Sequence, residues 1–436
     1  MEKASKSVDF LVVGAGISGM GATYALHKTE KSFAILEGRN RAGGVLESRE
    51  KNGYTYDLGA NSAASSASYL EFIQELGLED RFQSILARSL PRSLWQKQGL
   101  MRITSPLRSI LGARWLSPKA KWTLLTEPFR KSQHDAEESV YTFLSKRIGE
   151  EAVVKIVDAV MTGIYAGDIH QLSADVVFKE LKKGVIEHGS LFNAMRKKKT
   201  NGPRTISGFH GGFSDLSHAF EKKFAENLVL NANVQSIHRK ENQWEVTLTN
   251  GSIYFSKNLI LTPPAHATAA LLEPVHSELS AALNTISYAP MGVLHLGIPH
   301  GDHPLPNELG FLVPNYVNRS LLGALYISQI FEKRSPENHD VIVVFHRHQG
   351  EAEAVYQMVK NDLDKIPFLK KDVTILDNTW WDNAIPQFNL GSKANLQKIK
   401  QLTQEMEGLE LAGNYLGKVG LADVFESGMQ AVKRLS

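Results

Sequence analysis

Three glycines near the start of the chain have the spacing of a phosphate-binding turn. Gly14, Gly16 and Gly19 stand in G-x-G-x-x-G order, directly after the apolar run Phe10–Val13 and before a segment with a helical pattern. In such a turn the first glycine permits a tight bend, the second lets the backbone approach a pyrophosphate, and the third lets the helix pack close to its strand. The free N–H groups at the helix start then face the phosphates. The spacing therefore predicts that a nucleotide binds here.

An acid at the end of the next strand supports the same interpretation. A second apolar run, Phe33–Leu36, is followed by Glu37, at the distance expected for a carboxylate that hydrogen-bonds ribose hydroxyls. For the glycines alone, a glycine-rich turn without a ligand is the alternative. Strand, helix, second strand and terminal acid together favour a bound dinucleotide, and we expect the rest of the chain to be organised around it.

The composition excludes several other kinds of site. The 436 residues include no cysteine, which rules out disulfides, thiolate metal ligands, cysteine nucleophiles and a flavin tethered through sulfur. The 49 basic and 46 acidic residues leave a net charge of +3, too close to neutral to predict a nucleic-acid-binding protein. The length allows two or three domains. A polar N-terminal stretch, and the lack of any apolar run of about 18 residues, predict a cytoplasmic protein that does not span a membrane.

One segment departs from this balanced charge. Between Arg88 and Lys131, ten basic side chains stand against one acid, Glu127, and large apolar residues are interleaved with them. This pattern is typical of amphipathic helices that lie on an anionic membrane surface. A basic solvated face on an ordinary helical subdomain is the alternative. Binding to RNA is poorly supported, because no recognised module accompanies the basic residues.

Six separated segments resemble one family of flavoproteins. The runs GAGISGMGATYAL, LEGRNRAGG and DLGANSA are similar to the flavin-containing amine oxidase superfamily, and DLGANS resembles its protoporphyrinogen oxidase branch. The segments TGIYAGDIHQLS (162–173) and WWDNAIPQFNLG (380–391) resemble further signatures of that branch. The run LELAGNYLGKVGLADVFESGMQAVKRL (409–435) is similar to the closing strand, turn and helix of the family. The resemblance covers nearly the whole chain.

The resemblance implies non-covalently bound FAD. In the family the downstream acid holds the adenosine ribose, an arginine lies beside the FAD, and the double glycine and the D-x-G loop run along the isoalloxazine ring. Ala60 stands where many members have proline, which affects the stiffness of that loop. The closing helix would place its positive end at the flavin pyrimidine edge. The residues expected at the cofactor are Gly14, Gly16, Ile17, Ser18, Gly19, Glu37, Arg41, Gly43, Gly44, Gly59, Ala60, Asn61, Val234, Gly413, Val419, Gly420 and Leu421.

The fold expected from these segments is α/β, or α+β overall, in three parts. A Rossmann-type FAD-binding domain is expected over 1–85, 203–265 and 400–436. It is interleaved with a mixed-sheet substrate-binding domain over 86–96, 172–202 and 266–399. The third part, 97–171, is expected to be a helical, basic, membrane-associating subdomain.

The strand-like segments between Ala289 and Phe345 suit a sheet that walls an apolar pocket. In the branch, apolar residues of these segments clamp a tetrapyrrole ring that carries propionates, which implies a basic anchor at the pocket mouth. The local spacing differs by one residue from the family, so both Arg92 and Lys97 are candidates for that anchor. No general base is assigned, and His346 and His348 are interpreted as surface side chains at a strand end. The residues expected at the substrate are Arg92, Lys97, Gly163, Leu312, Leu322 and Phe345.

The activity implied by the resemblance is oxidation of protoporphyrinogen IX to protoporphyrin IX in heme biosynthesis, by repeated hydride transfer to flavin N5 with oxygen as acceptor. Three alternatives stay open. One is coproporphyrinogen oxidation, which needs more basic groups for the extra propionates. Another is a flavin amine oxidase, in which Trp380 and Trp381 would belong to an aromatic cage. The last is a non-catalytic, flavin-binding partner of the heme pathway. Attachment to the inner face of the membrane, contact with the following enzyme ferrochelatase, and a homodimer are further expectations.

Overall fold

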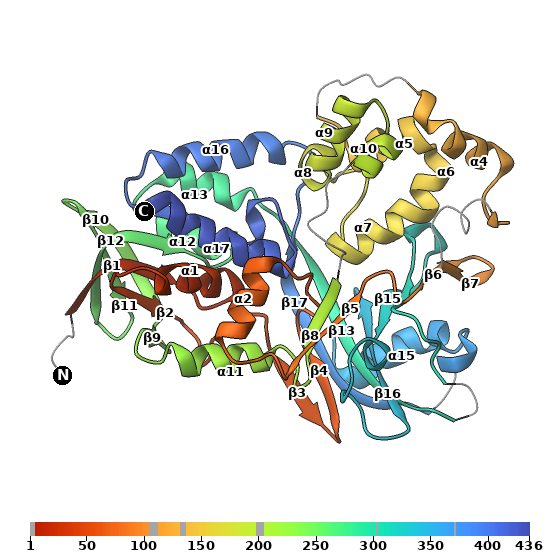
Figure 1. The fold of residues 1–436 in the computed structure, drawn as a ribbon, viewed down its shortest axis with the longest axis horizontal. Coiled ribbons are helices and arrows are strands. Elements are labelled where there is room, and N and C mark those ends of the chain that lie inside the picture. Colours follow the sequence, from red (N-terminus) through yellow and green to blue (C-terminus); the bar gives the residue numbers. More distant parts are fainter. Residues whose placement is uncertain (1–4, 104–111, 131–136, 198–204, 302–303, 370–371) are drawn as a thin grey trace.

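The computed structural model describes residues 5–103, 112–130, 137–197, 205–301, 304–369 and 372–436. Over these residues the chain forms two seven-stranded sheets, two short two-stranded sheets and a group of helices. In Figure 1 the first large sheet and its helices occupy one half of the molecule, and the second large sheet and the helical group occupy the other. The expected α/β class is confirmed.

The first large sheet is mixed and contains the Rossmann-type unit. Its strands are β1 Ser5–Val13, β2 Phe33–Leu36, β9 Leu228–Val229, β10 Val234–Lys240, β11 Gln243–Leu248, β12 Ile253–Leu261 and β18 Leu409–Leu411. The order is β10-β11-β12-β1-β2-β9, and β18 pairs with β12. Because β1 pairs in parallel with both β2 and β12, Val13 at its end lies beside Leu36 and Leu261. The C-terminal strand β18 therefore reaches the same sheet as the first strand of the chain.

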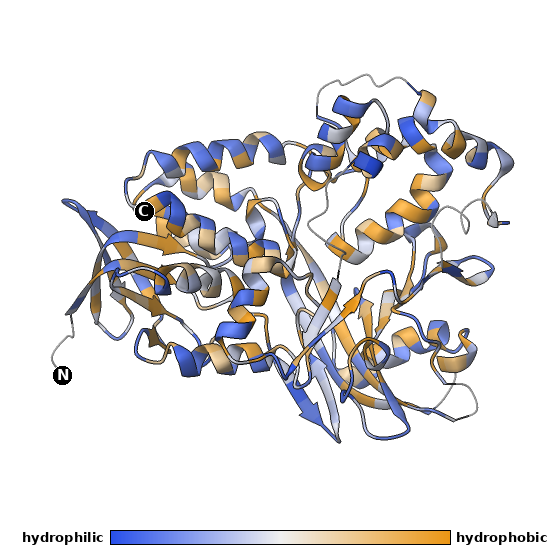
Figure 2. Cartoon of the chain, in the orientation of Figure 1, coloured by the Kyte–Doolittle hydropathy of each residue, from blue (hydrophilic) through white to orange (hydrophobic). Residues whose placement is uncertain are grey.

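Helices cover both faces of this sheet. One face packs against α1 Ile17–His27, α2 Ala67–Glu75, α11 Ser214–Lys223 and α17 Leu421–Leu435. The other packs against α12 Ala265–Leu272, α13 Ser277–Asn284 and α16 Ser392–Gln404. Along β1, Phe10 and Val12 enter the first core and Leu11 and Val13 the second, as the two-residue period of a strand requires. In Figure 2 the apolar colour gathers on the central strands of this sheet, whereas the outer hairpin and the helices α16 and α11 are largely polar.

The second large sheet positions the candidate substrate residues. Its strands are β6 Arg92–Gln96, β7 Gly99–Ile103, β13 Tyr288–Pro299, β14 Gly310–Leu312, β15 Leu321–Tyr326, β16 His339–His346 and β17 Thr374–Pro386, in the order β17-β13-β16-β15-β14-β6-β7. One face packs on α15 Ala352–Leu363. The opposite face packs on β4 Tyr54–Asp57, which forms a hairpin with β3 Ser48–Lys51. A further pair, β5 Phe82–Leu86 and β8 Thr205–Phe209, runs between the two halves (Figure 1).

The helical group lies beside the second sheet. It contains α4 Pro118–Leu125, the 3-10 turn η1 Glu127–Phe129, α5 Val140–Ile148, α6 Glu150–Ala152, the π-helical turn η2 Val153–Val157, α7 Asp158–Tyr165, α8 Ala174–Val177, α9 Lys179–His188 and α10 Leu191–Lys197. No helix in the part of the chain that the structure describes is long and apolar enough to cross a bilayer.

The amphipathic helices that the composition of Arg88–Lys131 suggested do not form in the first part of this segment. Residues Arg92–Ile103 form the hairpin β6–β7 at the edge of the second sheet, where Leu94 and Trp95 are buried. Four consecutive residues of β6 are buried, because the strand pairs with β14 inside the second sheet, and this long-range pairing overrides the composition that suggested helices. Only the later part is helical, as α4, and residues 104–111, including Arg108, lie outside the described residues.

The division into three domains stays a prediction, but the packing differs from it at two edges. Residues Gly99–Ile103, expected in the helical part, extend the second sheet as β7. Helices α8, α9 and α10, expected in the substrate domain, share an apolar core with α5 and α7. Their buried residues, such as Val185 and Leu191, have no place on the second sheet because α15 and β4 already cover its faces.

Candidate cofactor site

The glycine turn has the geometry that its spacing predicts. Gly14 has a φ of +96°, which favours glycine. A Cβ added at Gly19 would lie 2.0 Å from the carbonyl oxygen of Gly14, so only glycine lets α1 start this close to the turn. The helix begins after Gly16, and no side chain caps it. The first N–H groups of α1, at Ile17 and Ser18, are therefore not taken up by a capping side chain.

Glu37 combines burial with spare hydrogen-bonding capacity. It is 8% exposed, its Oε2 accepts the N–H of Ala15 at 2.8 Å, and its Oε1 accepts the N–H of Arg39 at 2.9 Å. A carboxylate offers about four lone-pair sites, so about two remain for ribose hydroxyls. The N–H of Ala232 donates to the carbonyl of Glu37 at 2.8 Å, which brings the start of β10 at Val234 close to the same place.

The double glycine lies against the first turn. The N–H of Gly43 donates to the carbonyl of Ala15 at 2.8 Å, and Gly16 and Gly43 form an isolated parallel bridge. A Cβ at Gly43 would lie 2.1 Å from Oγ of Ser217, and a Cβ at Gly16 would have Gly44 Cα, 4.0 Å away, as its nearest neighbour. Gly16, Gly43 and Gly44 thus form one surface of bare backbone.

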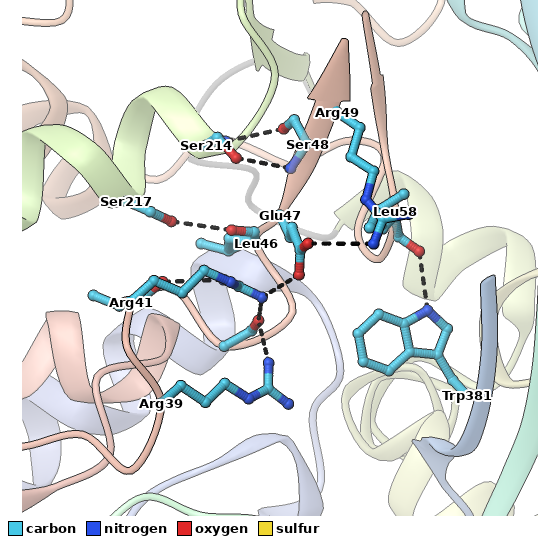
Figure 3. Close-up of polar contacts among 12 residues, drawn as sticks. Arg39, Arg41, Leu46, Glu47, Ser48, Arg49, Leu58, Ser214, Ser217 and Trp381 are labelled. Atoms are coloured by element: carbon cyan, nitrogen blue, oxygen red, sulfur yellow. Dashed lines mark hydrogen bonds and ion pairs between the residues drawn. The ribbon is translucent and has the colours of Figure 1, made fainter. Parts of the chain in front are cut away.

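Arg41 supports this surface from one side. Its Nη1 donates to the carbonyl of Ala42 at 3.1 Å and its Nη2 to that of Gly44 at 3.0 Å, and it pairs with Glu47. Arg39 donates to the same Gly44 carbonyl at 3.1 Å (Figure 3). Arg41 therefore holds the double-glycine turn in shape, and a direct contact with FAD stays a prediction.

The loop after β4 carries an unpaired polar atom. A Cβ at Gly59 would lie 2.3 Å from the carbonyl oxygen of Val45, so the loop packs directly behind the double glycine. Asn61 is 7% exposed, and its Nδ2 donates to the carbonyl of Gly59 at 3.0 Å. Its Oδ1 is buried without a hydrogen-bond partner among the described residues. Such an acceptor costs about 1–3 kcal/mol unless a donor reaches it, and a ring N–H of a flavin beside Ala60 would be one.

The C-terminal helix reaches the site through glycine contacts with α1. A Cβ at Gly21 would lie 1.9 Å from the carbonyl oxygen of Phe425, and a Cβ at Gly428 would lie 1.8 Å from that of Ser18. Sequence reasoning did not single out this pair, although a glycine inside a helical pattern is itself a signal of close packing.

The start of α17 is also free of a capping side chain. Gly420 is the cap residue, Leu421 opens the helix as a buried residue, and Val419 precedes them. The N–H of Gly413 donates to Oγ of Ser427 at 3.3 Å, which ties the end of β18 to this helix.

The donor set suits FAD better than a smaller ligand. Two uncapped helix starts suit charged or polar oxygens, a buried carboxylate suits a ribose, and bare glycine backbone lets a flat ring approach closely. An orphaned buried acceptor at Asn61 suits a ring N–H. These elements come from residues 14–19, 37–44, 59–61 and 413–421, which the fold brings to one edge of the first sheet.

One face of the second sheet gathers the candidate substrate residues. Phe345 pairs with Gly323, Gly323 with Leu312, and Leu312 with Leu94, so these four residues form a row across neighbouring strands on one face. A Cβ at Gly163 would lie 2.7 Å from Cδ2 of Leu312, so α7 covers the row. The structure therefore brings Gly163, Leu312 and Phe345 together.

The other three substrate candidates are placed differently from one another. Arg92 precedes Leu94 by two residues and so shares the face of the row, at its exposed end. Lys97 follows β6 in the exposed turn of the β6–β7 hairpin. Leu322 is buried at a register irregularity of β15, and its carbonyl accepts the N–H of Val313 at 3.0 Å. The geometry favours Arg92 over Lys97 as the basic group beside the row.

A polar cavity of about 440 Å³, which sequence reasoning missed, lies at the end of α7. Arg347, two residues beyond Phe345, donates through Nη2 to the carbonyl of Ala166 at 3.3 Å at its wall. The carboxylate of Asp158 accepts two hydrogen bonds from Asn315, at 2.6 Å from its N–H and 2.9 Å from its Nδ2. Asp158 thus links the helical group to the second sheet.

His346 is not a surface side chain, contrary to the sequence interpretation. It is fully buried, its Nε2 lies 2.8 Å from Oδ1 of Asn378, and its Nδ1 accepts the N–H of His348 at 3.2 Å. Burial lowers its pKa to about 4. Since both ring nitrogens are engaged, His346 is a structural residue, and no general base is assigned.

The fold and the glycine-lined site define the class of protein as a dinucleotide-binding α/β protein with a second large sheet. The family model for flavin containing amine oxidoreductase matches residues 17–436. The chain therefore belongs to the flavin-containing amine oxidoreductase family. It is a flavin-dependent oxidoreductase, and its cofactor is FAD.

Known relatives span the whole chain. The chloroplastic protoporphyrinogen oxidase of Nicotiana tabacum is 26% identical and covers 98% of this chain and 85% of that protein. Coproporphyrinogen III oxidase of Bacillus subtilis is 23% identical, and the match covers 97% of this chain and 96% of that protein. Among solved structures, one from Exiguobacterium sp. 255-15, assigned by name to protoporphyrinogen oxidase, has a TM-score of 0.81 at 20% identity, with 99% of both chains covered. Cyclohexylamine oxidase from Brevibacterium oxydans has a TM-score of 0.73 at 15% identity, with 98% of both chains covered.

Replacing Glu37 by glutamine tests the ribose contact. We expect the substitution Glu37→Gln to weaken FAD binding about 10- to 100-fold, because an uncharged amide is a weaker acceptor for hydroxyl donors. The measurement is a titration of the apoprotein with FAD, followed by quenching of flavin fluorescence. The control is Glu50→Gln on exposed β3, for which affinity should stay within about twofold. Equal affinities for both variants would remove Glu37 from the site.

Proposed function

We propose that this chain oxidises protoporphyrinogen IX to protoporphyrin IX. The observation that carries the proposal is the apolar row of Leu94, Leu312 and Phe345, covered by α7 at Gly163, with the basic Arg92 at its exposed end. An apolar macrocycle with a carboxylate edge matches a surface of this kind. The relatives named for porphyrinogen oxidation, which match along the full chain, support the same substrate class.

The chain's own residues bind and orient the substrate in this proposal. Bound FAD supplies the acceptor for the two electrons of each oxidation step. The apolar row on the second sheet and the neighbouring helix α7 shield the reacting carbon from water. Arg92 fixes the orientation by pairing with a propionate. Molecular oxygen as the final acceptor stays a prediction.

The arrangement of two tryptophans argues against the amine oxidase alternative. Trp380 and Trp381 are consecutive in β17, so their side chains point to opposite faces of the sheet. The indole N–H of Trp381 donates to the carbonyl of Leu58 at 2.9 Å, whereas that of Trp380 donates to Oδ1 of Asp382 at 2.8 Å. The pair therefore cannot form two walls of one aromatic cage around an ammonium group.

Anaerobic reduction of the bound flavin tests the proposed substrate. We expect protoporphyrinogen to bleach the visible absorption of the holoprotein, because each oxidation step delivers two electrons to the flavin. Coproporphyrinogen and a panel of primary amines are the comparison substrates. Faster bleaching by coproporphyrinogen would favour that alternative, and bleaching by an amine alone would contradict the proposal. A holoprotein that no porphyrinogen bleaches would be the non-catalytic partner.

The two candidate anchors are separated by matched substitutions. We expect Arg92→Met to raise the KM for protoporphyrinogen about tenfold, the effect of losing one charge-assisted hydrogen bond, with kcat less affected. Lys97→Met, in the hairpin turn, should change KM less than about twofold. Steady-state oxidation assays give both constants. The reverse ranking would assign the anchor to Lys97 and contradict the placement of Arg92 beside the row.

We also propose that the helical group attaches this chain to an anionic membrane surface, on the cytoplasmic face. Trp122 is 68% exposed, Leu125 49% and Phe129 86%, and all three lie on α4 and η1. Basic residues lie close to them in the sequence, namely Arg114, Lys119, Lys121 and Arg130. Exposed large apolar side chains within a basic surface are typical of proteins that lie on anionic lipids.

A buried carboxylate extends this surface to a second helix. Oε1 of Glu127 accepts the N–H of Leu191 at 2.7 Å, and Oε2 accepts that of Phe192 at 3.3 Å. Its ion pair with buried Arg147 has a separation of 3.7 Å. Glu127 therefore fixes η1 against the start of α10, where Phe192 and Met195 are also exposed. Contacts with ferrochelatase and formation of a homodimer stay predictions.

Vesicle binding tests the membrane surface. We expect the double substitution Trp122→Ser and Phe129→Ser to weaken binding to phosphatidylglycerol-containing vesicles at least about tenfold, because each side chain loses an apolar contact with lipid. Met358→Ser, at an apolar residue of α15 that is 50% exposed, is the control and should leave binding unchanged. Vesicle sedimentation at low and high salt measures the binding of the double variant and of the control. Undiminished binding by the double variant would contradict the proposed surface.

A further inference from the structure

Two ring N–H groups from the second sheet hold consecutive carbonyls of the segment that leads into the cofactor loop. Nε2 of His295, on β13, lies 2.9 Å from the carbonyl oxygen of Asp57. Nε1 of Trp381, on β17, donates to the carbonyl of Leu58 at 2.9 Å (Figure 3). Gly59 follows immediately, so two donors from the sheet meet the backbone just before the loop of Gly59–Asn61.

These donors share a face with the candidate substrate residues. His295 pairs with Val343, which precedes Phe345 by two residues, so His295 and Phe345 lie on the same face of the sheet. Trp381 pairs with Met291 on the same side of the neighbouring strand. One sheet face therefore contacts the cofactor loop at one end and forms the apolar row at the other.

His295 is neutral, and its single ring N–H donates to the carbonyl of Asp57. The residue is completely buried, and burial lowers its pKa to about 4, although the carboxylates of Asp57 and Asp377 act in the opposite direction. The imidazole is therefore neutral near pH 7, with a single N–H. Its ring packs against that of Tyr56, tilted by 34° with 4.6 Å between centroids, which restricts the orientation of that N–H toward the Asp57 carbonyl.

The neighbouring tryptophan shows that the contact is specific to position. Trp380 has the same side chain and lies on the same strand, but its indole N–H bonds to Asp382 at an exposed site. Of the two tryptophans, Trp381 alone donates to the segment before Gly59. The strand thus supplies a natural comparison for the role of the indole donor.

We propose that His295 and Trp381 are positioning residues for the flavin. By holding the carbonyls of Asp57 and Leu58, they fix the loop of Gly59–Asn61 against the isoalloxazine ring and tie it to the sheet that lines the substrate pocket. The inference rests on FAD binding and on the cofactor role of this loop, and it is independent of the porphyrinogen.

The first test compares Trp381→Phe with Trp380→Phe, each of which removes one indole N–H and keeps an aromatic ring. We expect Trp381→Phe to raise the Kd for FAD about tenfold, the effect of one lost hydrogen bond, and to shift the visible absorption bands of the bound flavin. Trp380→Phe should leave the Kd for FAD within about twofold of the original value and the visible absorption bands of the flavin unshifted. The assay contains no substrate, so its outcome is separate from that of the proposed reaction.

The second test asks whether the donor itself is what matters at position 295. His295→Gln places an amide N–H near the position of Nε2, whereas His295→Leu removes the donor. We expect the His295→Gln protein to bind FAD within about threefold of the affinity of the original protein. The His295→Leu protein should bind FAD about tenfold more weakly, or weaker still. Circular dichroism and thermal unfolding identify the folded variants.

Two results would overturn the proposal. One is a folded Trp381→Phe protein with a lowered Tm but with unchanged FAD affinity and an unchanged flavin spectrum, since the residue would then only stabilise the fold. The other is equal loss of FAD affinity in the Gln and Leu variants at position 295. If Trp381→Phe does not fold, the comparison at position 295 decides.

Discussion

The buried ion pair between Asp57 and Arg334 is the interaction on which the junction of the two halves depends. The two side chains are 1% and 0% exposed, and their closest atoms are 3.1 Å apart. Asp57 also accepts the hydroxyl of Ser48 at 2.5 Å and the N–H of Phe213 at 2.7 Å, so its charge is satisfied on several sides. Removing one partner of such a pair leaves an uncompensated buried charge, at a cost of about 3–5 kcal/mol. The β3–β4 hairpin is therefore fixed to the segment between β15 and β16.

The position of Asp57 explains why this junction matters for function. Its side chain meets Arg334, its carbonyl meets His295, and the next carbonyl meets Trp381. The residues that follow form the loop whose bare backbone and unpaired Asn61 acceptor fit a flavin ring. The five residues from Asp57 to Asn61 thus connect the second sheet with the loop that we propose to contact the flavin. At the first sheet, the close contacts of Gly21 and Gly428 between α1 and α17 fix the position of the C-terminal helix relative to the glycine turn.

Local signals predicted the backbone geometry of the glycine turn and the closing helix, whereas features that depend on long-range contacts could not be predicted. The turn at Gly14, the acid at Glu37 and the closing helix after Gly420 depend on backbone geometry within short segments, which spacing reveals. The hairpin β6–β7 could not be predicted from charge and apolar content, because it depends on the pairing of β6 with the distant strand β14. The buried state of His346 and the pairing of Asp57 with Arg334, 277 residues apart, could not be predicted, because they arise only when distant strands pack.

The central claim is that segments from both ends of the chain and the Gly59–Asn61 loop hold one FAD. Hydrogen–deuterium exchange of the apoprotein and the FAD complex measures this directly, segment by segment. The account predicts that FAD slows exchange together in residues 14–21, 43–47, 57–61 and 419–425, with the same dependence on FAD concentration. Protection confined to the N-terminal turn, or no protection by FAD in the folded protein, would contradict it.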